Sequence, residues 1–197
     1  MTIISRPYIL MWTIVGLFLT IGASFLPAYV TSSPWQWHTG YAVHSLEFRC
    51  QIGAVLLVSC LGGRTTGSLT QFIYVLLGLF GLKVFSDGGG IEYLQKPNFG
   101  YLLAFIPGAW VCGQLAFKKS AAQLEHLGFS CLCGLITIHV FGIIYLILFQ
   151  LINWHRLGEF KLLEWVIYYS INPFISQVLL ACAAASIAFL TRKIMFY

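Results

Sequence analysis

The sequence is poor in charged residues. Of its 197 residues only 9% are Asp, Glu, Lys or Arg, whereas 59% are hydrophobic. A water-soluble domain carries about 25% charged residues, so the charged residues of this chain are too few to cover a water-facing surface. We therefore predict an all-α, polytopic membrane protein: a bundle of six transmembrane helices that forms a single domain over residues 1–197.

The hydrophobic runs also lack the groups on which membrane enzymes and pumps depend. No Asp or Glu lies in the middle of a predicted span, which argues against an aspartyl membrane protease and a proton-coupled relay. The five histidines are dispersed, and His139, the one deep within a span, is interpreted as a neutral residue bonded to a neighbouring helix. No G-x-S-x-G elbow or phosphate-binding P-loop occurs. The sequence predicts no catalytic residue, no metal ligand and no cofactor.

The chain contains six cysteines, but they are not spaced in the sequence as the ligands of zinc sites are. None forms a C-x-x-C pair, and the two nearest in sequence, Cys131 and Cys133, would point to different faces of a helix. All fall within or at the ends of apolar runs: Cys50, Cys60, Cys112, Cys131, Cys133 and Cys182. They are interpreted as small packing residues in lipid.

Long hydrophobic runs make up most of the chain. Their hydropathy predicts six membrane spans, each near the length of about 20 residues that crosses a bilayer. The spans cover residues 8–26, 46–61, 66–85, 99–117, 127–151 and 173–190. Gly62, Gly63 and Arg64 are predicted to turn the chain between the second span and the third.

The last span is predicted to start at Pro173, because Ser170-Ile171-Asn172-Pro173 is typical of a helix start. Residues 162–169 are then a separate interfacial segment. Pro97-Asn98 indicates a second helix start on the same side of the membrane. Two converging helix N-termini would suit an anionic ligand, and ordinary capping is the alternative.

The placement of lysine and arginine predicts the orientation. One side of the six-span arrangement has basic residues tight against the span ends, with Glu125 as its single acid: Arg6, Arg64, Lys118, Lys119, Arg192 and Lys193. Because basic residues favour the inner face, both termini are predicted to be cytoplasmic in a protein of the cell membrane. Because the basic residues form no continuous stripe, no nucleic-acid partner is predicted.

The most polar segment runs from residue 85 to residue 101, FSDGGGIEYLQKPNFGY. Its successive glycines permit positive φ and close approach to a ligand. The segment is predicted to be a lid over a ligand, with a flexible surface connector as the alternative. The candidate residues are Phe85, Asp87, Gly88, Gly89, Gly90, Tyr93, Lys96, Asn98 and Tyr101, and Gln51 and Gln177 can join a pocket beneath the lid.

From about residue 51 to residue 112, and more weakly beyond, the chain resembles the BioY-type biotin transporters, in particular the cyanobacterial versions. These proteins are the substrate-binding S components of energy-coupling-factor transporters. The resemblance rests on Tyr74-x3-Gly78-x2-Gly81, Val84-Phe85, Pro97-x2-Gly100-Tyr101 and Pro173-Phe174. It implies a six-helix, vitamin-binding membrane subunit that holds biotin near the outer face, and it implies an energy-coupling transmembrane subunit and ATPase subunits as partners.

The resemblance also implies roles for the candidate residues. Phe85, Tyr93 and Tyr101 would flank the rings of biotin, while the Gly88–Gly90 backbone amides, Lys96 and Asn98 would bind its polar ends. The family pattern P-F-L-P-G-D-L-L-K is here P-F-I-S-Q-V-L-L-A, with Val178 and Ala181 in place of the acid and the lysine. We hypothesise that Gln177 or Ser176 substitutes for the acid.

Two alternatives stay open. The chain could transport another small vitamin, since the acid and the lysine of the family pattern are replaced. It could also be a membrane scaffold that binds partner helices and no small molecule. The resemblance also implies an A-x-x-x-A pattern in the first span for docking on the coupling subunit. That pattern is not clean here, and Gly16-x3-Thr20 and Leu19-x3-Ala23 are the nearest spacings.

Overall fold

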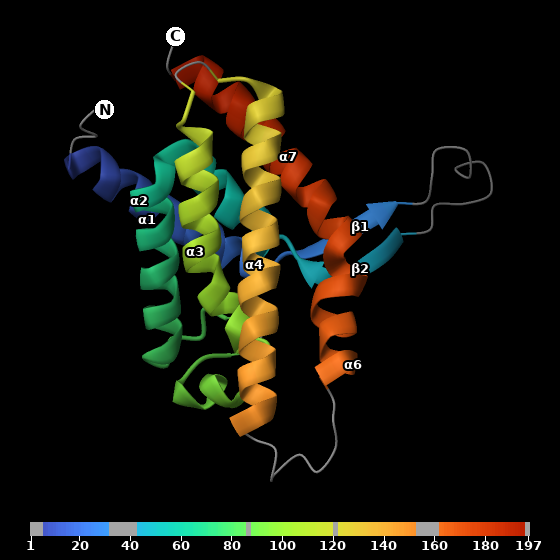
Figure 1. The fold of residues 1–197 in the computed structure, drawn as a ribbon. Coiled ribbons are helices and arrows are strands. Elements are labelled where there is room, and N and C mark those ends of the chain that lie inside the picture. The colour runs from blue at the N-terminus through green and yellow to red at the C-terminus, as the bar shows by residue number, and fades with distance from the viewer. Residues whose placement is uncertain (1–5, 32–42, 86–87, 120–121, 153–161, 196–197) are drawn as a thin grey trace.

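The computed structural model describes residues 6–31, 43–85, 88–119, 122–152 and 162–195 (Figure 1). Within these ranges, five helices are long and apolar enough to cross a membrane. The elements are α1 (Arg6–Phe25), α2 (Gln51–Leu79), α3 (Phe99–Ala116), α4 (Leu124–Ile152), α6 (Leu162–Val166) and α7 (Asn172–Met195). The predicted first, fourth and fifth spans correspond closely to α1, α3 and α4. The predicted number of six helices is not confirmed.

Helix α2 is the reason for the different number, because it contains both the second and the third predicted spans. The predicted turn is present as a break at Gly63, whose φ of 79° and ψ of −178° are not helical. The break folds the two halves close together: a Cβ placed on Gly67 would lie 3.1 Å from the Cα of Ser59. Each half is shorter than the about 20 residues that cross a bilayer, and the two halves pack against each other as a helical hairpin.

The chain before α2 is a β-hairpin, which corrects the predicted start of the second span at residue 46. Strand β1 (Pro27–Thr31) pairs antiparallel with β2 (Val43–Arg49), and Val30 lies opposite His44. The sequence LEFR at residues 46–49 alternates apolar and polar residues, as strands do. The helix starts only at Gln51.

The third predicted span ends early. The structure ends α2 at Leu79, and the chain leaves the helix through Gly81, whose φ is +93°. Residues 80–85 therefore belong to the loop between α2 and α3 and not to a span. That loop continues into a short 3₁₀ helix, η2 (Ile91–Gln95).

The last span is longer than predicted. Helix α6, the π-helical turn η3 (Ile167–Ile171) and α7 form one continuous helical stretch, Leu162–Met195. Proline has no N–H and its ring clashes with the carbonyl four residues earlier in an α-helix. The wide π turn just before Pro173 accommodates that ring. The prediction of a free helix N-terminus at Pro173 is therefore wrong, and so is the separate segment at residues 162–169.

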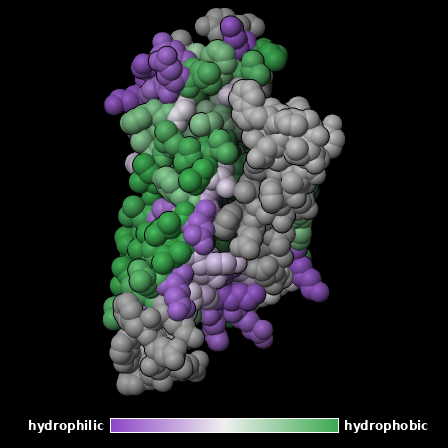
Figure 2. Space-filling model, turned by 90° about the vertical axis from the view of Figure 1, so that its right-hand side faces the viewer, coloured by the Kyte–Doolittle hydropathy of each residue, from purple (hydrophilic) through white to green (hydrophobic). Residues whose placement is uncertain are grey.

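Small residues allow the central helices to pack closely. A Cβ placed on Gly108 of α3 would lie 3.1 Å from the carbonyl oxygen of Gly134 of α4, and the reverse distance is the same. Such backbone contact is typical of helix pairs in membranes. There the helices associate through van der Waals packing, because the lipid is as apolar as the side chains and the hydrophobic effect does not drive association. The outward faces remain apolar, and Phe18 of α1 is 71% exposed. Figure 2 shows hydrophobic side chains along the upper and left parts of one face, and hydrophilic side chains across its lower centre.

The two ends of the bundle differ in what they carry. Helix α1 starts and α7 ends near the same end of the bundle, and the α2–α3 loop with η2 lies at the other (Figure 1). Lys118 and Lys119, which follow α3, and Arg192 and Lys193, in the last turn of α7, belong to the end of the termini. The lid segment and this basic end are therefore separated by the length of the bundle.

Candidate functional site

The lid segment is packed onto the bundle through Phe85. Its side chain is 1% exposed and lies edge-on to the Tyr74 ring, with 5.3 Å between the centroids. The ring occupies the space where a side chain of Gly78 would project. Both Tyr74 Oη and Ser24 Oγ donate to the Val84 carbonyl oxygen, at 3.1 and 2.9 Å. The segment is thus seated between α1 and α2.

The glycines of the lid have the backbone geometry that the sequence predicted. Gly88 and Gly90 take φ of +110° and +107°. Their N–H groups donate to carbonyl oxygens of the chain, Gly88 to Phe85 at 3.2 Å and Gly90 to Gly78 at 2.7 Å. A ligand could reach these two amides only if those bonds opened. Asp87, another predicted binding residue, lies outside the described residues.

An aromatic row leads from the lid into the bundle. Neighbouring rings have centroid separations of 4.7, 6.4, 6.2, 6.0 and 5.8 Å along the order Phe85, Tyr93, Phe99, Tyr145, Phe149 and Trp165. Tyr145 Oη also donates to the Leu94 carbonyl oxygen of η2 at 3.0 Å. The row therefore ties the lid to α3, α4 and α6.

Two polar residues of the lid surround Tyr93. Lys96 Nζ lies 4.5 Å from the centre of the Tyr93 ring, and Asn98 Nδ2 donates to Tyr93 Oη at 3.2 Å. Asn98 Oδ1 is buried and has no hydrogen-bond partner among the described residues. Since buried acceptors are normally satisfied, Asn98 Oδ1 is available to a donor group.

A second group of polar side chains lies within the bundle, and we call it the buried polar chain. It consists of Tyr101 of α3, Ser170 of η3, His139 of α4 and Gln177 of α7. Ser170 Oγ lies 2.6 Å from Tyr101 Oη and 3.1 Å from His139 Nδ1, and His139 Nε2 lies 2.7 Å from Gln177 Oε1. His139 and Gln177 are each 6% exposed.

The chemistry of the groups sets the direction of these hydrogen bonds. An amide oxygen only accepts, so His139 Nε2 carries the proton and donates to Gln177. In a neutral imidazole Nδ1 then accepts from Ser170, and Ser170 accepts from Tyr101. The prediction that His139 bonds to a neighbouring helix is confirmed. Gln177 keeps its amide N–H groups, for which the described residues show no acceptor.

Aromatic rings border the buried polar chain. The Tyr101 ring lies 6.1 Å from the His139 ring and 5.8 Å from the Tyr169 ring, and Phe174 lies 5.5 Å from His139, all between centroids. Amide and hydroxyl groups beside such rings suit a small ligand that has an apolar ring with hydrogen-bonding groups.

The predicted site residues therefore fall into two groups. Phe85, Tyr93, Lys96 and Asn98 cluster at the lid, whereas Tyr101 and Gln177 meet in the buried polar chain. No hydrogen bond or ring contact in the described part joins Gln51 or Ser176 to either group. Gln51 is 8% exposed and its Nε2 has no partner there, and Ser176 is half-buried.

Sequence reasoning missed Ser170 and Tyr145. Ser170 belongs to the segment that was interpreted as a helix start, but its hydroxyl bonds to Tyr101 of α3 and His139 of α4. Only the π turn brings Ser170 to this position, and no local pattern predicts such a turn. Tyr145 lies in an apolar run where an aromatic residue gives no signal of its own.

Comparisons with known proteins agree on one family. The BioY family pattern matches residues 10–196. An uncharacterised 21.2 kDa protein of Cyanophora paradoxa is 28% identical over 191 residues, covering 97% of this chain and 98% of that one. The probable biotin transporter BioY of Lysinibacillus sphaericus is 38% identical over 101 residues, with 51% and 52% covered.

Two further similarities bear on the fold and the family. The biotin transporter BioY of Thermotoga maritima is 43% identical over 77 residues, covering 39% of this chain and 46% of that one. The alignments with these two biotin transporters thus span about half of their length. The crystal structure of the biotin S-component of an ECF-type ABC transporter superposes with a TM-score of 0.70 at 19% identity, covering 98% and 95%.

Proposed function

The chain belongs to the BioY family, and from this premise we propose that it takes up biotin as the substrate-binding S component of an energy-coupling-factor transporter. Relatives of 38% and 43% identity are named a probable biotin transporter and a biotin transporter. The fold is that of a biotin S component. The chain is an integral membrane protein, and the proposal places it in the cell membrane with both termini in the cytoplasm.

The buried polar chain is the observation that carries this proposal at the level of chemistry. Biotin has a ureido group, with two N–H donors and one carbonyl acceptor, fused to an apolar thioether ring. The Gln177 amide offers a complementary donor and acceptor, and its orientation is fixed by the bond from His139 Nε2. Gln177 adjoins Val178, which stands where the family pattern has an acid. Gln177 therefore supplies the polar contact that the acid would make.

The lid completes the proposed binding site. Tyr93 and Phe85 would cover the apolar part of the ligand, and Asn98 Oδ1, buried without a partner in the described part, would accept from it. Since the Gly88 and Gly90 amides already donate to carbonyl oxygens, the described conformation corresponds to a closed lid. Ligand uptake then requires that the lid opens.

The test is the binding of radiolabelled biotin to the purified protein, with unlabelled biotin and other vitamins as competitors. Replacing Gln177 with Leu removes a buried hydrogen-bonding partner, so we expect a loss of about 1–3 kcal/mol, or roughly 5- to 150-fold in Kd. Ser186→Ala is the matched control on the same helix, because Ser186 is exposed and donates only to the Cys182 carbonyl oxygen.

Each outcome of this experiment decides between named alternatives. Unchanged affinity in a Ser176→Ala, Gln177→Leu double variant would overturn the assignment of these residues. Binding of another vitamin but not of biotin would favour the alternative cargo. That alternative follows from Ala181, which is 1% exposed at a position where the family pattern has a lysine. Binding of no vitamin would favour the scaffold.

The energy-coupling partners are part of the same proposal. A groove of about 320 Å³ lies between α1, α2 and α7, lined by apolar side chains that include Phe18, Leu57 and Leu180. Small residues, among them Gly22 and Gly53, also line it. Such a surface suits a transmembrane helix of a coupling subunit. Co-purification with the coupling module, reduced by Gly22→Leu, tests this contact, and retention of the module by that variant would contradict it.

A further inference from the structure

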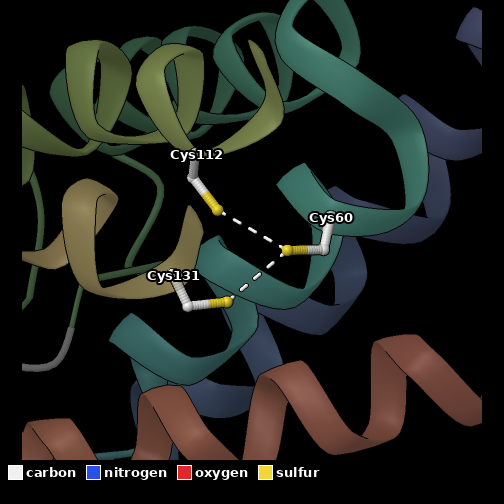
Figure 3. Close-up of side chains that lie close together, drawn as sticks. All are labelled: Cys60, Cys112 and Cys131. Atoms are coloured by element: carbon white, nitrogen blue, oxygen red, sulfur yellow. Dashed lines mark hydrogen bonds between the residues drawn. The ribbon is translucent and has the colours of Figure 1, made fainter. Parts of the chain in front are cut away.

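Three cysteines that are far apart in the sequence meet inside the bundle. Cys60 of α2 has its Sγ 3.6 Å from that of Cys112 of α3 and 3.5 Å from that of Cys131 of α4. All three sulfur atoms lie within 4.8 Å of one another. Figure 3 shows the three side chains pointing toward a common centre from three different helices.

The environment of this cluster is closed. Each of the three cysteines is 0% exposed. Cys112 lies at the close crossing of α3 and α4, where a Cβ placed on Gly134 would come 2.7 Å from the Cys112 Cβ. The Leu56 carbonyl oxygen is 3.8 Å from Cys112 Sγ. The sulfur atoms are thus held by three packed helices.

The separations of the sulfur atoms match a metal site. Metal–sulfur bonds are about 2.3 Å long, so three sulfur atoms around one ion in a plane lie about 4 Å apart. The Cys60–Cys112 and Cys60–Cys131 separations of 3.6 and 3.5 Å differ from this value by about half an ångström or less. We propose that Cys60, Cys112 and Cys131 form a three-sulfur site that binds one copper(I) ion.

The number and kind of ligands select copper(I). Thiolate sulfur is a soft ligand that favours Cu(I) and Zn(II) among common ions. Structural zinc sites have four protein ligands, and no fourth His, Cys, Asp or Glu joins the cluster within the described part of the chain. Copper(I) is satisfied by three sulfur ligands in a plane. Binding releases the S–H protons of the cysteines and leaves copper in the same oxidation state.

Arg192, a buried cation bonded to the same helix as Cys112, supports a metal site that carries negative charge. Arg192 is 6% exposed, and Ala116, to which it bonds, lies one helical turn beyond Cys112 in α3. Its guanidinium donates to the Ala116 carbonyl oxygen at 2.9 Å and lies 4.2 Å from the Phe117 ring centre. Because copper(I) carries a single positive charge, coordinated thiolates leave a net negative charge, which Arg192 partly balances. The proposed copper site is separate from the proposed biotin site, so copper binding can be tested without biotin.

The experiment uses the full chain with Cys50, Cys133 and Cys182 replaced by alanine, so that only the three clustered cysteines remain. The protein is titrated anaerobically with Cu(I) against a chromophoric Cu(I) chelator, and the bound ion is examined by X-ray absorption spectroscopy. We expect one equivalent of Cu(I) per chain, surrounded by sulfur only. Cys60→Ser on this background should lose that equivalent, and Arg192→Gln should weaken binding about 10- to 100-fold.

The controls separate metal binding from folding. Elution as a single species in size-exclusion chromatography, together with unchanged thermal unfolding without copper, shows that Cys60→Ser still folds. Should this variant unfold, Cys112→Ala replaces it, and the sulfur coordination of the parent protein remains an independent readout. The proposal is overturned if the parent protein releases all copper to the chelator, or if its three cysteines form a disulfide instead. Retention of copper by a folded Cys60→Ser variant overturns it as well.

Discussion

At the scale of single residues, the contact between Gly78 and Phe85 positions the lid. The Phe85 ring leaves no room for a methyl group at Gly78. We expect Gly78→Ala to destabilise the protein by about 1–3 kcal/mol, the usual cost of overpacking. The lid should also become accessible to protease. Thermal unfolding in detergent and limited proteolysis measure the two effects.

Gly128→Ala is the matched control for this prediction. Gly128 lies within α4, and a Cβ placed there would meet nothing within 4 Å. Alanine is favoured over glycine in a helix by about 1 kcal/mol, so this variant should be at least as stable as the parent. Equal stability of the two alanine variants would contradict the role assigned to Phe85.

Residue contacts across the bundle mark the limit of sequence reasoning. Cys60 meets partners 52 and 71 positions away, and His139 bonds to Gln177 at a separation of 38. No local spacing encodes such pairs, because they depend on how the helices cross. The positive φ of Gly88 and Gly90, by contrast, was predictable, since glycine alone adopts it at no steric cost.

At the scale of elements, the break in α2 depends on one glycine. Gly63 has space for a side chain, because a Cβ there would be 3.5 Å from the Phe117 ring. Its φ of 79° with ψ of −178° is, however, a backbone conformation that glycine alone adopts readily. We expect Gly63→Ala to lower the free energy of unfolding by about 1–3 kcal/mol, measured by denaturation in detergent.

Gly53→Ala in the same helix serves as its control. A Cβ there would be 3.7 Å from the Cβ of Leu180, which is ordinary van der Waals contact. This variant should therefore keep the parent stability. A similar loss in both variants would show that α2 tolerates no added methyl group anywhere, and the argument from φ and ψ would then be wrong.

Two elements escaped prediction for different physical reasons. The predicted second span starts at residue 46, inside β2, because hydropathy does not detect the pairing of residues 43–49 with β1. Pro173 normally marks a helix start, but the π turn before it lets the helix continue. Helices α1, α3 and α4 were predictable because long apolar runs in lipid have no stable alternative to the helix.

At the scale of the whole molecule, the separation between the basic end and the lid end makes the orientation testable. Ile91 of η2 is 74% exposed at the lid end, and Lys193 is exposed at the other. Both Ile91→Cys and Lys193→Cys are made without Cys50, Cys133 and Cys182. In intact cells, a membrane-impermeant maleimide should label the first variant and not the second.

Permeabilised cells provide the control, because both variants should then react equally. Labelling of Lys193→Cys alone in intact cells would reverse the proposed orientation and place the lid in the cytoplasm. Basic residues near the span ends are the sequence feature that predicts the orientation. Their common location at one end of the bundle is consistent with it.

The break at Gly63 also has a consequence for how the protein is made. Neither half of α2 has the length of a membrane span, so the first half has little tendency to remain in the lipid when it leaves the insertion machinery. The second half of α2 must be synthesised before the two halves can pack together in the membrane. We therefore expect residues 51–79 to insert as one unit, and a stall between the halves would leave an apolar segment exposed to chaperones and proteases.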